Sequence, residues 1–343
     1  MTVGTFARTN TFVLSDTTIT ETSTPNNTTT HVISVKGSSY GVCNNSALTV
    51  PVVECEALGD LYNSTAGASW TNKTNWMISP DVNSWFGVTT TTVSSQQYVY
   101  YLCMHRDNAG NSWCSGSSSN NNGNNLIGTI PASIGNLSYL KFLIMSFNSI
   151  SGSLPTTIDQ LDRVTHMYLN HNLLNGSLPS TIGGMALLQY MYMYNNSISG
   201  TIPSGIASLP SIIYIHLGTN NLSGPIPDMS ALNNTLQNLV LSTNNLSGPI
   251  PSWIYNMTNL RTLYLGGNPI TGTLSSSINN LTNLTHLMLD SAQMSGPMPA
   301  ITIPTLQYLH THSNAFTTLP ASLPASLREY LGYTNSMAGS LPT

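Results

Sequence analysis

The sequence predicts a right-handed solenoid of about nine or ten turns with one parallel sheet on its concave side. Three observations support this prediction: glycines recur every 24 residues, asparagines recur four residues before them, and apolar residues keep the same register. The glycines are Gly128, Gly152, Gly176, Gly200, Gly224, Gly248, Gly272 and Gly296, and the asparagines start at Asn124 and continue as Asn148, Asn172, Asn196, Asn220, Asn244 and Asn268. Residues 124–343 are therefore expected to form one repetitive domain.

Each recurrent position has a physical role. In segments such as "LKFLIMSFNSISGSLP" and "LRTLYLGGNPITGTLS" the apolar residues flank a short strand, so that every second side chain points inward. Stacked turns pair these strands into a sheet and bury the leucines, which one repeat cannot do alone. The inward asparagine is expected to satisfy backbone groups that the turn leaves unpaired. Glycine permits the next backbone conformation, and proline fixes the start of the convex segment.

The repeat pattern, L-x-x-L-x-L-x-x-N-x-L-x-G-x-[IL]-P, resembles the leucine-rich repeat of the plant-type extracellular subclass, as in receptor-like ectodomains. The stretch before it, "ECEALGDLYNSTAGASWTNKTNWMISPDVNSWFGVTT", resembles the N-terminal cap of the same family. The resemblance implies a solenoid over 124–343 and a cap over 41–123 that contains a short helix at about Glu54–Tyr62. The sequence departs from the family at Thr90, where the cap usually has a cysteine.

Residues 1–40 belong to neither part. Alternation in "TFVLSDTTIT" and "HVISVKG" predicts two β-strands, for which the rest of the chain offers no evident sheet. At the other end the register drifts: Ala292 replaces the ladder asparagine, and the next two repeats shorten to 22 and 21 residues. Short repeats of this type are more tightly curved, so a local change in the superhelix is expected there.

The composition favours a secreted glycoprotein. Charged residues are only 6% of the chain, with 8 Lys+Arg and 12 Asp+Glu, so there is no basic field for nucleic acid. No apolar run reaches the roughly 20 residues of a membrane span. Covalent N-linked glycans would supply the solubility that charges do not. The predicted acceptors are Asn26, Asn27, Asn44, Asn63, Asn72, Asn136, Asn175, Asn195, Asn221, Asn233, Asn245, Asn256, Asn280 and Asn283.

The four cysteines, Cys43, Cys55, Cys103 and Cys114, all precede the repeats. An even number beside a repeat array is typical of short disulfide loops in the cap of a secreted protein. A zinc site is a poorer interpretation because neither pair has C-x-x-C spacing. The departure at Thr90 leaves the pairing open, and the most local solution joins Cys43 to Cys55 and Cys103 to Cys114.

The sequence offers no catalytic constellation. The repeats carry only scattered acids, and no nucleophile elbow, P-loop or H-E-x-x-H motif occurs. We therefore expect no enzyme and no cofactor. His310 and His312 lie two apart on one strand face, and with His286 one turn away they could hold a metal. Without a nearby carboxylate, exposed strand histidines are the plainer interpretation, and no metal site is predicted.

The outward positions of the strands form the predicted binding face, because solenoids usually bind on their concave side. Two columns of residues run across the turns, and Tyr194, His171 and His312 lie beside them. Rings with polar edges suit a sugar or a protein partner, although stacking across strands also stabilises the sheet itself. The residues proposed for binding are Phe142, His166, Tyr168, Tyr190, Tyr192, Tyr214, His216, Tyr264, His286, Tyr308 and His310.

Two functions from different classes follow. The first is a structural protein that assembles head to tail into an extracellular filament: "TNSMAGSLPT" leaves the last turn without a polar cap, and the strands within residues 10–36 could pair with the next molecule. The contact would bury Leu327, Leu331, Met337 and Leu341. The alternative is a monomeric recognition module of the receptor-ectodomain type that binds a protein, peptide or glycan on its concave face.

Overall fold

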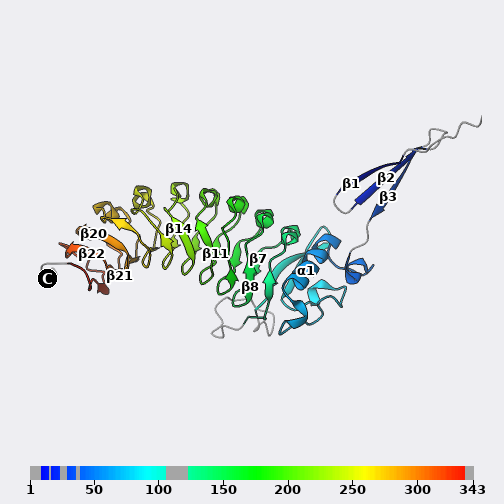
Figure 1. Ribbon diagram of the computed structural model, residues 1–343, viewed down its shortest axis with the longest axis horizontal. Helices are drawn as coiled ribbons and strands as arrows, with labels where there is room; N and C mark the ends of the chain where they lie inside the picture. Colours follow the sequence, from blue (N-terminus) through cyan, green and yellow to red (C-terminus); the bar gives the residue numbers. More distant parts are fainter. Residues whose placement is uncertain (1–8, 15–16, 24–28, 36–38, 106–122, 337–343) are drawn as a thin grey trace, which may run out of the picture.

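The computed structural model describes residues 9–14, 17–23, 29–35, 39–105 and 123–336. Its main feature is an 11-stranded sheet that runs through every turn of the solenoid (Figure 1). The leucine-rich-repeat architecture predicted from the 24-residue period is confirmed. In spatial order the strands are β4 (Val88–Val93), β5 (Gln96–Cys103), β7 (Phe142–Ile144), β9 (His166–Tyr168), β11 (Tyr190–Tyr192), β13 (Tyr214–His216), β15 (Asn238–Val240), β17 (Thr262–Tyr264), β19 (His286–Met288), β21 (Tyr308–His310) and β23 (Glu329–Leu331).

All neighbouring strands of this sheet are parallel except β4 and β5, which form an antiparallel pair at the cap. The pairing is in register with the sequence repeat: Leu143 lies opposite Met167, and Met191 lies opposite Ile215. These central side chains point into the solenoid and are fully buried. The hydrophobic core is thus continuous from the cap to the last described turns, as stacking of incomplete units requires.

Three smaller parallel sheets are formed by short strands that follow the strands of the long sheet in the chain, most of them at or just before a repeat glycine. They are β6 (Ile127–Thr129) with β8 (Ser149–Gly152) and β10 (Leu173–Leu174), β12 (Ser199–Thr201) with β14 (Asn221–Gly224) and β16 (Asn245–Leu246), and β18 (Thr271–Gly272) with β20 (Gln293–Pro297) and β22 (Ala315–Thr318). Gly152 has a φ of +75°, and a Cβ there would lie 2.9 Å from Thr129 Cγ2. The position therefore favours glycine for its backbone conformation and for its lack of a side chain.

Short 3-10 helices lie on the opposite side of most turns, and none occurs in the described residues after Asn280. They are η4 (Ala132–Asn136), η5 (Thr156–Gln160), η6 (Ser180–Gly184), η7 (Ser204–Ser208), η8 (Ser230–Leu232), η9 (Ser252–Asn256) and η10 (Ser276–Asn280). Several follow a proline directly, for example Pro155 with a φ of −65°, because the ring presets the angle at which the helix begins. Ile158 in that helix is fully buried, so the convex side also contributes to the core.

The inward asparagines hold consecutive turns together as predicted. The Asn172 Oδ1 accepts a hydrogen bond of 3.0 Å from the Ile150 N–H of the preceding turn. Its Nδ2 donates to the Met145 carbonyl of the preceding turn at 3.0 Å and to the Leu169 carbonyl of its own turn at 3.1 Å. The ladder breaks at Ala292 and resumes at Asn314, whose Nδ2 donates to the Leu289 carbonyl at 2.8 Å.

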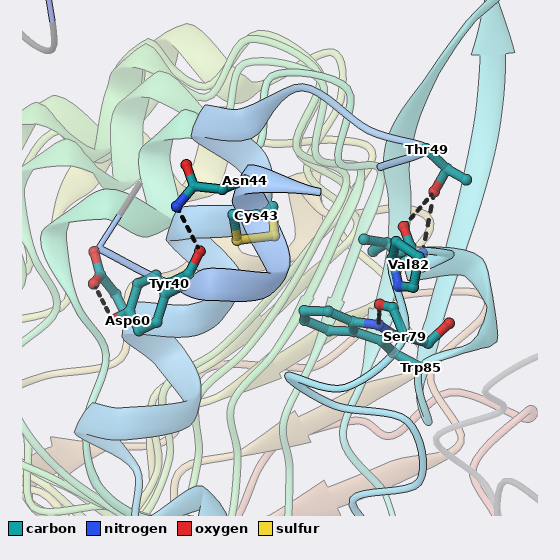
Figure 2. Close-up of a disulfide and its surroundings, with 10 residues drawn as sticks. Tyr40, Cys43, Asn44, Thr49, Asp60, Ser79, Val82 and Trp85 are labelled. Atoms are coloured by element: carbon teal, nitrogen blue, oxygen red, sulfur yellow. Dashed lines mark hydrogen bonds between the residues drawn. A yellow bond between two sulfur atoms is a disulfide. The ribbon is translucent and has the colours of Figure 1, made fainter. Parts of the chain in front are cut away.

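The N-terminal cap is a helix packed on the first turn, with a disulfide beside it (Figure 2). The predicted helix is confirmed as α1 (Val52–Ser64), accompanied by η1 (Gly41–Asn44), η2 (Gly67–Ser69) and η3 (Val82–Ser84). The disulfide joins Cys43 in η1 to Cys55 in α1, with their Cα atoms 5.7 Å apart. Asp60 of α1 accepts hydrogen bonds of 2.6 Å from the Tyr40 hydroxyl and from Ser133 in η4, so it ties the cap to the array.

Tryptophans fill the centre of the cap. The rings of Trp70 and Trp76 lie 4.8 Å apart, and those of Trp76 and Trp85 lie 5.0 Å apart. The Trp85 Nε1 donates to the Ser79 carbonyl at 2.8 Å, as Figure 2 shows. Cys114, the predicted partner of Cys103, lies outside the described residues, so the second predicted disulfide stays a prediction.

The N-terminal extension differs from its prediction. It contains β1 (Thr9–Leu14), β2 (Thr17–Ser23) and β3 (Thr29–Val35), which pair with one another in a three-stranded antiparallel sheet. The expectation that these strands lack a partner within the chain is wrong, because β2 pairs with both β1 and β3. Of the helices that the structure describes, none is long and apolar enough to cross a membrane.

Candidate functional site

The outward side chains of the long sheet form a continuous aromatic face. The strand register places Tyr101 of β5 beside Phe142, Phe142 beside His166, and His166 beside Tyr190 and then Tyr214. A second column is Tyr168, Tyr192 and His216, and after Asn238 and Val240 the aromatic residues resume with Tyr264, His286 and Tyr308. We call these residues the aromatic face: Tyr101, Phe142, His166, Tyr168, Tyr190, Tyr192, Tyr214, His216, Tyr264, His286 and Tyr308.

The rings stack across strands. The centroids of Tyr101 and Phe142 are 4.5 Å apart, those of Phe142 and His166 are 4.6 Å apart, and those of His166 and Tyr190 are 4.6 Å apart, all with nearly parallel planes. Neighbouring strands lie about 4.8 Å apart, so rings in one column meet at their optimal stacking distance. Every ring of the aromatic face remains partly exposed, so its outer surface is available to a ligand.

The face carries little charge at neutral pH. Burial lowers the pKa of His166, His171 and His286 below the usual value of 6.5, and it lowers the pKa of His216 to about 4. Burial also raises the pKa of Tyr168, Tyr192 and other tyrosines of the face. Imidazoles and phenols therefore stay neutral together, which favours contacts with apolar and hydrogen-bonding groups over charge steering.

A cavity of about 390 Å³ opens on this face beyond the tyrosine cluster. Ser242 and Gly266, the small residues at this position of two successive turns, are part of its lining. Tyr264 forms one wall, and Asp290 and His310 contribute to another. A ligand side chain could enter here while the rest of the ligand lies along the rings.

The sequence placed these rings on one face, and the parallel register brings them together in the predicted columns. It missed Tyr101, which precedes the repeats but joins the first column through β5. It also missed Asp290, Glu329 and Tyr333. Two of these, Asp290 and Tyr333, could have been found from the sequence, because they belong to a third column of outward positions. This column lies two residues beyond the second one: Asp290 follows Met288 by two positions and Tyr333 follows Leu331 by two, as His312 follows His310.

The remaining predicted sites fall outside this face or outside the described chain. All described acceptor asparagines are exposed except Asn72, which is half-buried. Asn26 and Asn27 lie outside the described residues. Of the predicted assembly residues, Leu327 and Leu331 are half-buried within this chain, and Met337 and Leu341 lie outside the described residues.

Comparison with known proteins supports the repeat assignment. Leucine-rich-repeat family models match residues 139–161, 187–209 and 234–294. No curated protein matches the sequence. The plant peptide hormone receptor RGFR1, solved in complex with RGF2, is 32% identical over 62% of this chain and 35% of that chain, with a TM-score of 0.57.

Two further structures resemble the fold over more of its length. The ectodomain of the Arabidopsis receptor kinase HAESA, in complex with an N-terminally extended IDA peptide hormone ligand, is 26% identical over 81% of this chain and 46% of that chain, with a TM-score of 0.63. A plant ice-binding protein is 22% identical over 86% of this chain and 90% of that chain, with a TM-score of 0.67, and shows the fold alone. This chain spans less than half of either receptor. The repeat period, the solenoid and these matches show a leucine-rich-repeat fold that is similar to that of plant receptor ectodomains.

Proposed function

We propose that the chain is an extracellular recognition module that binds an extended peptide or protein segment along its aromatic face. The observation that supports this most is the run of partly exposed, stacked rings from Tyr101 to Tyr190, with a cavity further along the same face. Aromatic side chains contribute large contact areas at low entropic cost and are enriched at binding hot spots.

The charge state of the face supports the same proposal. Since burial keeps the histidines neutral, the surface offers π-faces, phenol hydroxyls and imidazole nitrogens but no strong field. Such a surface suits a ligand that contributes apolar side chains and backbone amides. The receptors RGFR1 and HAESA, which share the fold, were solved with peptide hormones bound.

The secreted, N-glycosylated state is part of this proposal. The exposed acceptor asparagines, the disulfide between Cys43 and Cys55 and the low content of charged residues support it. We propose neither catalysis nor a cofactor.

End-to-end assembly, the first function that the sequence predicted, was based on two observations, and the structure removes one of them. Strand donation to a neighbour needs N-terminal strands that are unpaired in their own chain, whereas β1, β2 and β3 pair with one another. We therefore favour the recognition module.

The test begins with a displayed library of random peptides selected against the native glycoprotein. A selected peptide should bind with a Kd that rises at least about tenfold in the Tyr192→Ala, Tyr214→Ala double variant, because these rings are stacked 4.8 Å apart at the centre of the face. Leu187→Ala is the matched control, since Leu187 is an exposed apolar residue that lies outside the strands. Selection of no peptide that depends on the two tyrosines would contradict the proposal.

A further inference from the structure

Three side chains with metal-binding atoms converge at the far end of the concave face. Asp290, His310 and His312 each offer a ligand atom, and these atoms all lie within 4.8 Å of one another. His312 Nε2 is 4.0 Å from Asp290 Oδ2. His310 Nε2 is 2.7 Å from Glu329 Oε1, which brings a second carboxylate to the cluster.

The repeat register builds this cluster. Asp290 lies two residues beyond β19, and His312 occupies the same position one turn later, beyond β21. The turns are held together by hydrogen bonds from the Leu289 N–H to the His310 carbonyl at 2.8 Å and from the Ser291 N–H to the His312 carbonyl at 2.9 Å. The cluster therefore comes from two rigidly paired turns, and its side chains are only partly exposed.

Gly266 leaves room for the Asp290 carboxylate. It occupies the corresponding position one turn earlier, and a Cβ there would lie 2.6 Å from Asp290 Oδ1 and 2.8 Å from the Asp290 carbonyl oxygen. Any larger residue would displace the carboxylate, so the glycine and the acid are spatially matched.

The distances suit an ion between the ligands better than direct pairing. A separation of 4.0 Å between His312 Nε2 and Asp290 Oδ2 is beyond a hydrogen bond. With metal–ligand bonds of about 2.0–2.2 Å, ligand atoms in a tetrahedral site lie about 3.4 Å apart, which small side-chain rotations can reach from here. A donor set of two imidazoles and one carboxylate favours zinc as the bound ion over magnesium or calcium.

We propose that Asp290, His310 and His312 bind a divalent ion of the zinc class. Glu329 hydrogen-bonds His310 and adds negative charge beside the ion. Three protein ligands leave at least one coordination position for another donor. Because Asp290 and His310 also line the 390 Å³ cavity, a group of a bound ligand can fill that position.

The test is calorimetric titration of the tag-free native protein with Zn²⁺ alone. We expect saturable binding of one ion, and we expect Asp290→Asn and His312→Gln each to weaken it at least about tenfold. Substitution with Co²⁺ should give visible absorption bands that both variants lose. Gly266→Ala should weaken binding without removing any ligand, because it displaces the Asp290 carboxylate.

His171→Gln is the matched control, since His171 is a partly exposed histidine several turns away that belongs neither to this cluster nor to the aromatic face. It should bind Zn²⁺ as the native protein does, and metal-free melting temperatures should show that all variants are folded. Absence of saturable binding would overturn the proposal. So would an Asp290→Asn variant with native affinity, which would indicate only a surface histidine pair.

Discussion

His216 shows how one residue sets the chemistry of the aromatic face. Its ring packs edge-on against Tyr194 at 4.2 Å, and its Nδ1 is buried without a hydrogen-bond partner among the described residues. Burial, with a smaller contribution from the charge of His171, lowers the pKa of His216 to about 4. A proton on this ring would be poorly solvated, so the His216 side chain stays neutral in moderate acid.

The stability of the protein should therefore fall as His216 becomes protonated. Its pKa is 6.5 in the unfolded chain and about 4 in the folded one, so the unfolded state binds more protons between these values. The stabilisation is present above pH 6.5 and is lost as the pH falls to 4, by up to about 3 kcal/mol. His216→Phe should remove this component of the pH dependence, as measured by urea unfolding of both proteins from pH 7 to pH 4. Identical slopes would contradict the assignment.

Glu54 in the cap should give stability the opposite dependence on pH. The side chain is 1% exposed and accepts a hydrogen bond of 2.7 Å from the Val99 N–H, and burial raises its pKa from 4.5 to about 7. The folded state thus binds the extra proton between pH 4.5 and 7, and stability falls as the pH rises through this window. Glu54→Gln should gain up to about 3 kcal/mol relative to the native protein between pH 4.5 and pH 8. A constant difference across that range would show that Glu54 titrates normally.

At the scale of the element, the asparagine ladder is the main polar support of the solenoid. Asn220 accepts a hydrogen bond of 2.9 Å from the Ile198 N–H and donates to the Met193 and Leu217 carbonyls at 3.1 and 3.0 Å. Each of these backbone groups lies in the interior, where water cannot replace a lost partner.

Asn220→Ala should therefore destabilise the protein by about 2–4 kcal/mol, because several buried backbone groups lose their partners together. Asn234→Ala is the matched control, since this asparagine is exposed and is not a predicted glycan acceptor, and the free energy of unfolding should change by less than about 0.5 kcal/mol. Unfolding free energies from urea titrations measure both. Equal effects of the two substitutions would mean that the ladder bonds contribute no net stability.

The same elements show how far the sequence predicts the structure. The glycine and asparagine periods determine the register, and the register alone places Tyr190 beside Tyr214 and Asp290 beside His312. The pairing of β1, β2 and β3 could not be read, because short strands of Thr, Val and Ile pair equally well within a chain or between chains. Asp290 was overlooked because it lies outside the two columns that were considered, and Glu329 because the first column was followed only as far as Tyr308.

For the whole molecule, solubility depends on groups other than charges. Only 6% of the residues are charged, and the exposed acceptors Asn136, Asn221, Asn245, Asn256 and Asn280 are distributed over the array. We propose that most of them carry glycans. Peptide mass spectrometry before and after enzymatic deglycosylation tests this, and unmodified peptides at all five positions would contradict the secreted state.

The central claim is that the aromatic face is where a ligand binds, and hydroxyl-radical footprinting of the complex with a selected peptide tests it most directly. The account predicts that oxidation of Tyr192, Tyr214 and Tyr264 falls when the peptide is bound. Trp253 in η9, a half-buried ring on the convex side, should react as it does in the free protein. Protection of Trp253 with unchanged oxidation of the three tyrosines would contradict the account.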